Sequence, residues 1–147
     1  MPTTAPYGSW KSPITTDLIL SGAIGLGQVV LDDEDIYWLE IRPSEGGRMV
    51  IVKQSPETDT EPQPEPVDVT PEPFSVRTRV HEYGGGAYLV NDSVVYFSNF
   101  SDQRLYRQDP GEEPKPITPE TDTRYADGCF DATRNRIICV REDHASV

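Results

Sequence analysis

A strand-like segment recurs along this sequence at a nearly constant interval. Ile36–Leu39 (Ile-Tyr-Trp-Leu) aligns with Val94–Phe97 (Val-Val-Tyr-Phe), which begins 58 residues later, and Ile137–Val140 (Ile-Ile-Cys-Val) follows after 43 more. The first interval falls to about 42 residues when an acidic insertion of about 16 residues is removed from it. Such a repeat constrains the fold, because each unit buries its apolar face only by stacking against its neighbours.

Glycines and closing phrases follow the same interval. Gly27, Gly86 and Gly128 lie 9, 8 and 9 residues before the three aligned segments. The first two units close on similar phrases, Asp68–Glu72 (DVTPE) and Pro116–Glu120 (PITPE). A period of about 40–45 residues with four short strands per unit is typical of β-propeller blades. The alternative, a sandwich of meandering strands, does not require matching closing phrases.

The strand pattern predicts an all-β chain. No window of a dozen residues keeps an apolar stripe at helical spacing without meeting Pro or Gly. Short runs rich in β-branched and aromatic residues are instead bounded by Asp, Asn, Gly and Pro. The expected strands cover Gln28–Leu31, Asp35–Ile41, Arg48–Lys53, Ala87–Val90, Ser93–Ser98, Arg104–Arg107, Cys129–Asp131 and Arg136–Arg141.

The repeat accounts for about two and a half blades. We expect consecutive four-stranded antiparallel blades of an incomplete β-propeller, with blade one at about 14–72, blade two at about 73–120 and the start of blade three at 121–147. Closed propellers have about 4–8 blades. The chain is therefore expected to be the N-terminal segment of a longer propeller, a truncated gene product or an assembly-dependent fragment, and its open sheet edges favour self-association.

An acidic, Pro-rich insertion at 54–69 interrupts blade one. The wider stretch 54–73 holds six of the 14 prolines, six acids and no base, which is half of the net charge of -12. This composition buries too little apolar surface to offset the entropy of ordering. We interpret it as a solvated loop insertion; the alternative is a docking arm for a basic partner.

Charge and hydropathy exclude several classes of protein. The chain carries 13 Lys and Arg against 25 Asp and Glu, whereas binding a phosphate backbone requires a basic face. No apolar run approaches the ~20 residues of a membrane span, and the N-terminus lacks the features of a secretory signal. We expect a cytoplasmic protein that binds neither nucleic acid nor membrane.

Five phrases carry a resemblance to a known family. They are Ala5–Thr15, Ile36–Arg48, Arg77–Tyr88, Val95–Tyr106 and Arg124–Gly128, and the most specific part is His-Glu-Tyr-Gly-Gly-Gly at 81–86. Together they resemble the start of the N-terminal β-propeller in the prolyl oligopeptidase family of serine peptidases. The most similar branch is that of the dipeptidyl aminopeptidases and acylaminoacyl peptidases.

The resemblance implies a propeller that covers the active site of a C-terminal α/β-hydrolase domain and restricts access to short peptides. The nucleophile elbow of that domain, Gly-x-Ser-x-Gly, does not occur in this sequence, and neither His81 nor His144 fits its triad. No catalytic residue is predicted, and whether the chain is an enzyme stays open. The two His and two Cys lack zinc-site spacing, so no metal or cofactor is expected.

The predicted substrate-binding residues are Glu82, Arg79 and Tyr83. They lead into Gly84–Gly86 at the start of an expected inner strand, where missing side chains allow close approach to the backbone. In aminopeptidase members of the resembled family, propeller carboxylates pair with the substrate's α-ammonium group, which implies this role for Glu82. The alternative is structural: Arg79 pairs with Glu82, and Tyr83 packs between blades.

The two cysteines are expected to face each other across a hairpin. A turn at 132–135 would place Asp131 opposite Ile137 and Cys129 opposite Cys139. Opposed Cβ atoms lie about 4.5–5.5 Å apart, beyond the ~3.5–4.5 Å of a relaxed disulfide. In a reducing cytosol we expect two buried free thiols.

Two functions remain as hypotheses. The first is a non-catalytic propeller segment of a cytosolic serine peptidase, which gates access of short peptides and docks an α/β-hydrolase domain not present in this chain. The second is a stand-alone β-sheet interaction module that self-associates. A small independent enzyme is not supported, because no acid, base and nucleophile converge in the sequence.

Overall fold

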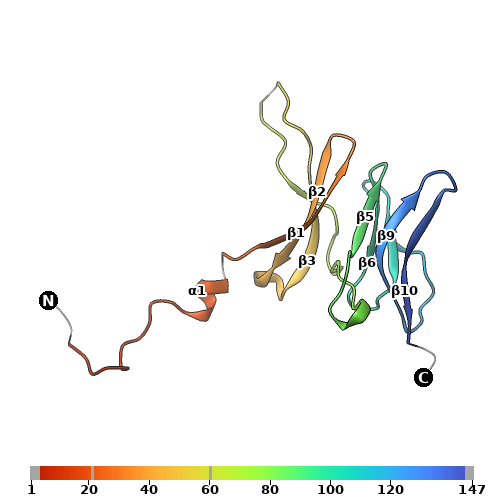
Figure 1. Ribbon diagram of the computed structural model, residues 1–147. Helices are drawn as coiled ribbons and strands as arrows, with labels where there is room; N and C mark the ends of the chain where they lie inside the picture. The colour runs from red at the N-terminus through yellow and green to blue at the C-terminus, as the bar shows by residue number, and fades with distance from the viewer. Residues whose placement is uncertain (1–3, 21, 60, 145–147) are drawn as a thin grey trace.

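The structure is a computed structural model that describes residues 4–20, 22–59 and 61–144, and it is built almost entirely of antiparallel strands (Figure 1). This confirms the predicted all-β class and the partial propeller. The strands are β1 Gly25–Asp32, β2 Asp35–Arg42, β3 Arg48–Gln54, β4 Val67–Asp68, β5 Tyr88–Asn91, β6 Val94–Ser98, β7 Leu105–Gln108, β8 Lys115–Pro116, β9 Thr123–Asp131 and β10 Arg136–Asp143. The helical elements are α1 Thr16–Leu20 and the 3₁₀ turns η1 Pro43–Glu45 and η2 Val80–Glu82.

The strands form two four-stranded sheets and one hairpin. The first sheet has the order β1-β2-β3-β4, the second has the order β5-β6-β7-β8, and β9 pairs with β10. Every pair is antiparallel, and each sheet takes its strands from one continuous stretch of chain. Two-residue turns make this local pairing possible: Asp92 and Ser93 both have positive φ (52° and 61°), as a tight hairpin turn requires.

The closing phrases of the repeat complete the outer edge of each sheet. Thr70 Oγ1 accepts a hydrogen bond from Ile51 N, and Thr118 Oγ1 accepts one from Leu105 N, each over 3.0 Å. These hydroxyls satisfy amide groups of β3 and β7 just where the short strands β4 and β8 stop pairing. Sequence patterns missed both short strands, because two residues display no periodicity.

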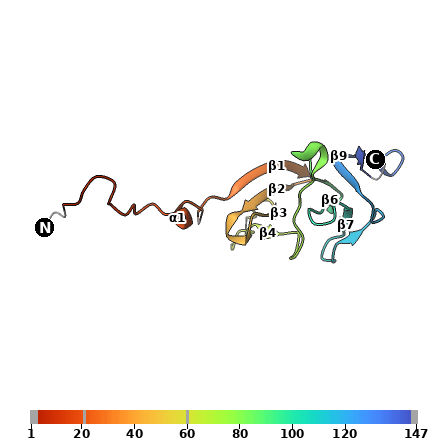
Figure 2. The same ribbon diagram turned by 90° about the horizontal axis from the view of Figure 1, so that it is seen from below.

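The inner strands of the three units lie side by side. β1 contacts β5 and β5 contacts β9, and the end-on view shows the later strands following outward from them (Figure 2). A core fills the space between the first and second sheets. It consists of Tyr37, Leu39, Ile51, Val76, Ala87, Tyr88, Val95, Phe97 and Tyr106. This radial stacking is the arrangement of propeller blades.

Bulged residues in β1 and β9 bind the start of β5. Gln28 (φ 44°) accepts a hydrogen bond from Ala87 N over 2.9 Å and donates one to Tyr88 O over 2.6 Å. On the other side, Asp127 (φ 53°) accepts from Gly86 N over 2.7 Å, and its own amide donates to Gly86 O over 2.8 Å. The pairing register shifts at each of these two positions, as expected for β-bulges. The bulges therefore join adjacent inner strands.

The hairpin β9–β10 corrects the predicted cysteine pairing. Asp131 lies opposite Arg136, and Cys129 lies opposite Ile138 rather than Cys139. The turn closes tightly because Asp131 accepts from the Arg136 guanidinium over 3.0 Å, and the bulge at Asp127 shifts the register further along. Both thiols are free as expected, but Cys129 is exposed and Cys139 is only half-buried, so the prediction of two buried thiols was wrong.

The acidic insertion leaves the first sheet as a protruding loop. Residues 55–59 and 61–66 extend beyond the ends of β2 and β3 (Figure 1), and the Gln54 side-chain amide donates to Pro64 O across the base of this loop. β4 lies inside the range predicted for the insertion, so residues 67 and 68 belong to the sheet.

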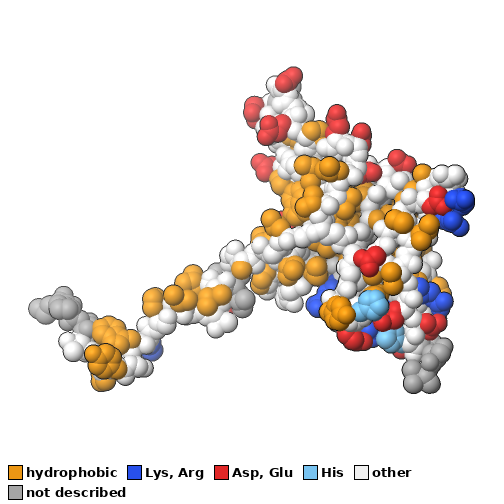
Figure 3. All heavy atoms as spheres, viewed as in Figure 1, with side chains coloured by type: hydrophobic (Ala, Val, Ile, Leu, Met, Phe, Trp, Pro, Cys, Tyr) orange, Lys and Arg blue, Asp and Glu red, His pale blue; other side chains and the backbone are white. Residues whose placement is uncertain are grey.

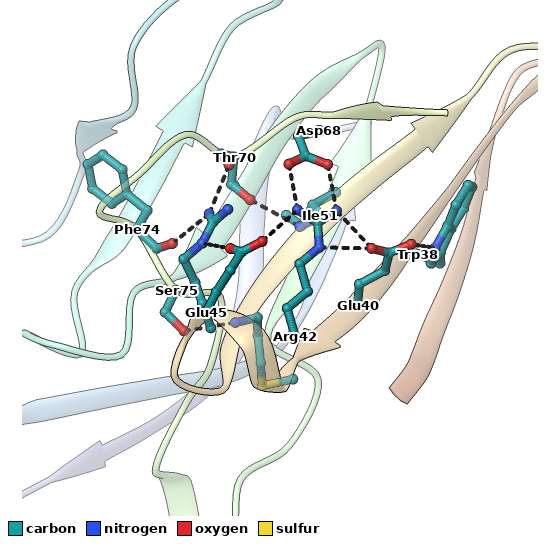
Figure 4. A network of polar contacts seen from close by, with 11 residues as sticks. Trp38, Glu40, Arg42, Glu45, Ile51, Asp68, Thr70, Phe74 and Ser75 are labelled. Atoms are coloured by element: carbon teal, nitrogen blue, oxygen red, sulfur yellow. Dashed lines mark hydrogen bonds and ion pairs between the residues drawn. The ribbon is translucent and has the colours of Figure 1, made fainter. Parts of the chain in front are cut away.

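A charge network fixes β4 to β2 (Figure 4). The Arg42 guanidinium donates to both carboxylate oxygens of Asp68 over 2.6 Å and to Glu40 Oε2 over 2.7 Å. Trp38 Nε1 donates to Glu40 Oε1 over 3.2 Å. The bond from Arg42 lowers the pKa of Asp68 and the bond to Asp68 raises the pKa of Arg42. The forked geometry gives this exposed edge strand a charge-assisted attachment.

Residues 4–20 and 22–24 extend away from the sheets (Figure 1). This arm carries large apolar side chains that remain solvent-exposed, namely Tyr7, Trp10, Ile14, Leu18, Ile19 and Ile24. α1 is short, and no helix in the described part of the chain is long and apolar enough to cross a membrane.

Replacing Gln28 should loosen the contact between the first two sheets. Gln28→Ala leaves Ala87 N and Tyr88 O without their side-chain partner, so we expect the free energy of unfolding to fall by about 1–3 kcal/mol. Urea denaturation measures this change. Gln63→Ala is the matched control, because it removes an amide that bonds only to residues 58 and 61 within the exposed loop. Equal effects of the two substitutions would contradict the role of Gln28.

The two thiols should react at different rates. Cys129 is exposed, whereas burial raises the pKa of Cys139, so less thiolate is present there at a given pH. Titration of the native chain with a chromogenic disulfide at pH 8 should show two thiols, with Cys129 reacting first. Cys129→Ser should abolish the fast phase. A single slow phase in the unsubstituted chain would contradict the exposure of Cys129.

Candidate functional site

The candidate site is built on the segment 76–86, which connects the first sheet to β5. Its turn η2 contains two non-glycine residues with positive φ, His81 (55°) and Glu82 (66°). Residues other than glycine rarely adopt this backbone conformation, and strained residues of this kind concentrate at functional sites. The turn carries Glu82 out into solvent, where 73% of its side chain is exposed.

The glycines after the turn permit close contact with β9. A Cβ atom on Gly85 would lie 3.0 Å from Asp127 Oδ2 and 3.1 Å from Ala126 Cβ. A Cβ atom on Gly86 would lie 3.0 Å from Asp127 Oδ1. A side chain at either position would crowd Asp127, so these two glycines allow the close packing between neighbouring units.

Arg124 of β9 organises the charges around the turn. Its Nη1 donates to Glu82 Oε1 over 2.6 Å and to Arg79 O over 2.8 Å, and it lies 3.8 Å from Glu142 Oε2. The bond to Glu82 raises the pKa of Arg124. Glu82 Oε2 has no hydrogen-bond partner among the described residues, so a ligand's cationic donor can reach it.

Glu142 of β10 lies between two histidines. His144 Nε2 is 2.9 Å from Glu142 Oε2, and His81 N donates to both carboxylate oxygens over 3.2 and 3.3 Å. The contact with His144 lowers the pKa of Glu142, and the His81 amide acts in the same direction. The turn is thereby attached to the last strand of the hairpin.

The structure separates the three predicted residues. Glu82 pairs with Arg124, not with Arg79. The Arg79 guanidinium instead lies 4.9 Å from the centre of the Phe100 ring, and Tyr83 is 88% exposed and does not pack between sheets. The structural alternative for these residues was therefore wrong, while their role in binding substrate remains a prediction.

Three residues of this cluster were missed from the sequence. Arg124, Glu142 and His144 lie far from Glu82 along the chain, and only Arg124 belonged to one of the phrases that carried the family resemblance. The repeat predicted that a third unit begins at residue 121, but it gave no signal for which of its side chains meet the turn.

The cluster brings together carboxylates, guanidinium groups and imidazoles. Within residues 4–20, 22–59 and 61–144, no three His, Cys, Asp or Glu side chains are placed to hold a metal ion.

Successive four-stranded antiparallel sheets with adjacent inner strands define this chain as part of a β-propeller. No protein-family model and no curated protein matches the chain.

Solved peptidase structures match it closely. A puromycin-hydrolyzing peptidase of Mycobacterium tuberculosis is 35% identical, with a TM-score of 0.81, over 97% of this chain and 22% of the peptidase. A puromycin hydrolase is 30% identical, with a TM-score of 0.75, over 92% and 22% of the two chains. Its S511A mutant, complexed with PGG, is 31% identical, with a TM-score of 0.74, over 91% and 21%.

These matches confirm the resemblance to the N-terminal propeller part of peptidases of the prolyl oligopeptidase family. This chain spans about a fifth of the length of the peptidases that it matches.

Proposed function

We propose that this chain is the non-catalytic propeller segment of a serine peptidase, where it gates access of short peptides and docks an α/β-hydrolase domain. The observation that carries the proposal is the 35% identity to a puromycin-hydrolyzing peptidase over 97% of the chain. Such identity over almost the whole chain, with a TM-score of 0.81, supports the same place in a larger protein.

Uncovered apolar surface supports a place in a larger assembly. On the face of the first sheet that points away from the core, Leu31 lies opposite Ile36 and Leu26 lies opposite Glu40, and all three apolar side chains are exposed. Hydrophobic side chains gather over β1, β2 and the arm in Figure 3. Exposed apolar patches of this kind mark interaction sites.

Glu82 is proposed to bind the α-ammonium group of the substrate. Its Oε1 is held by Arg124 over 2.6 Å, which orients the carboxylate and leaves Oε2 facing solvent-accessible space at the start of the inner strands. Arg79 and Tyr83 flank the turn and are proposed as neighbouring contacts. The proposed substrates are short peptides with free N-termini, as in the aminopeptidase members of the resembled family.

A cytoplasmic location is part of the proposal. The two cysteines lie in one hairpin and are both free, which fits a reducing compartment.

A hybrid enzyme tests the function. This chain would replace the matching segment of the Mycobacterium tuberculosis puromycin-hydrolyzing peptidase. If the chain has the proposed role, the hybrid should hydrolyse puromycin with a kcat/KM within about tenfold of the parent, which is ~1.4 kcal/mol of barrier. A folded hybrid with no hydrolysis would contradict the proposal.

In the same hybrid, Glu82→Gln should raise KM about fivefold for peptides with free N-termini and leave KM for N-acetylated peptides unchanged. Glu112→Gln is the control, because Glu112 is also an exposed carboxylate in an ion pair, with Lys115 in the β7–β8 loop.

The second candidate is a self-associating module, and the open edge of β10 favours it. β10 pairs with β9 on one side only, and Ile138 and Val140 on it are exposed. Unpaired strand edges are templates for association. Sedimentation velocity of the 147-residue chain should then show a discrete dimer or larger closed assembly whose population rises with concentration. Ile138→Lys should shift it to monomer. A monomeric unsubstituted chain would reject this candidate.

A further inference from the structure

Two arginines on the segment before the candidate site share one aromatic ring. Residues 76–80 alternate strictly: Val76, Thr78 and Val80 are buried, and Arg77 and Arg79 are exposed. An extended segment sends alternate side chains to opposite sides, so both arginines leave the core in the same direction. Each guanidinium carbon lies 4.9 Å from the centre of the Phe100 ring. This distance is within the range of cation–π contacts.

These two charges have no acidic partner. Nine of the 13 Lys and Arg residues have a carboxylate within 4.0 Å. The four without one among the described residues are Lys11 in the arm, Arg104, Arg77 and Arg79. Arg104 is satisfied by Thr118 O, to which its Nε and Nη2 donate. In a chain with 25 acids, Arg77 and Arg79 are left uncompensated.

The two guanidinium groups also lie near each other. Both touch one ring, so they are within about 10 Å, roughly one Debye length at 0.1 M salt, and they repel each other. An anion bound between or beside them would remove this repulsion. Among the guanidinium nitrogens of Arg77 and Arg79, only Arg79 Nη2 has a hydrogen-bond acceptor within the described residues; it donates to Phe100 O over 3.3 Å.

Arg107 shows what such a stacked arginine binds in this fold. Its guanidinium lies 5.9 Å from the centre of the Tyr96 ring, and its Nε and Nη2 donate to the two oxygens of Asp109 over 3.0 and 2.6 Å. Arg107 thus keeps its contact with the ring while two of its N–H groups bind one carboxylate in a forked, bidentate arrangement. Arg77 and Arg79 make a similar ring contact, but no carboxylate among the described residues is bound to their N–H groups.

From this geometry we infer that Arg77, Arg79 and Phe100 form a carboxylate-binding site for peptides. Arg79 begins the turn that carries Glu82, so the site lies on the same segment as the proposed ammonium site. A peptide provides carboxylates at its C-terminus and on Asp or Glu side chains. The choice of peptides as the source rests on the proposed function, whereas the carboxylate chemistry rests on the two uncompensated arginines.

Nuclear magnetic resonance titration of the 147-residue chain tests the site without requiring hydrolysis. Gly-Gly-Gly should shift the backbone amide signals of Arg77, Arg79 and Phe100, and its C-terminal amide should not. A second arm uses N-acetyl-Gly-Glu-Gly-amide, whose only carboxylate is on the side chain. Binding of one probe but not the other identifies the source of the carboxylate; binding of neither, or equal binding of the amide, overturns the site.

Substitutions locate the site. Arg77→Gln and Arg79→Gln should each raise Kd for the binding peptide at least fivefold. Arg77→Lys and Arg79→Lys keep the positive charge but lose the bidentate guanidinium geometry, so each should raise Kd by less than the Gln variant does. Arg107→Gln is the matched control, because that stacked arginine already holds Asp109, and Kd should not change. Unchanged Kd in the Arg77 and Arg79 variants would overturn the assignment.

This experiment separates the site from the proposed function. Loss of the carboxylate site leaves the effect of Glu82→Gln on KM intact, because that effect depends on the ammonium end of the substrate. Failure of the hybrid enzyme would leave the peptide titration of the chain unaffected.

Discussion

The contact between neighbouring inner strands determines how the rest of this structure is arranged. Gln28 and Asp127, one in each flanking strand, bind consecutive backbone groups at the start of β5. Both adopt positive φ within a bulge, which turns a side chain that would lie on a sheet face toward the next strand. These bonds are directional, unlike the apolar packing between the sheets, and they help to fix how one blade is rotated against the next.

The candidate site follows from this constraint. The glycines at 85 and 86 bring the backbone against Asp127, and the turn before them therefore stands beside β9 and β10. Arg124 and Glu142 reach the turn from these strands and attach it by charge-assisted bonds. The strained turn is held from two strands, β9 and β10, and Arg124 orients the Glu82 carboxylate. If Glu82 binds a cationic group as proposed, a carboxylate held in this way loses less entropy on binding.

Sequence reasoning was most successful where the structure is local. The 43-residue repeat identified hairpins whose strands are consecutive in the chain. The closing phrases matched because the hydroxyl groups of Thr70 and Thr118 each accept a hydrogen bond from a strand amide at the outer edge of a sheet. It failed at a turn. The register of Cys129 was one residue off, because the four-residue turn 132–135 pairs Asp131 with Arg136 rather than with Ile137, and this register holds as far as Cys129. The pairing of Glu82 with Arg79 was also wrong, because two neighbours along a strained turn point in different directions, and the partner came from 42 residues away.

The amino-acid order alone determined the β class, the blade length and the protruding acidic loop, and five phrases in it carried the resemblance to peptidase propellers. The first three depend on composition or on spacing along the chain, and these need no knowledge of what lies nearby in space. Only the tertiary structure decided which charges meet: Glu82 pairs with Arg124 and Arg42 with Asp68, whereas Arg77 and Arg79 have no acidic partner among the described residues. Ion pairs form between side chains brought within a few ångströms, and in a stack of sheets those distances are set by bulges and register, which no periodic pattern records.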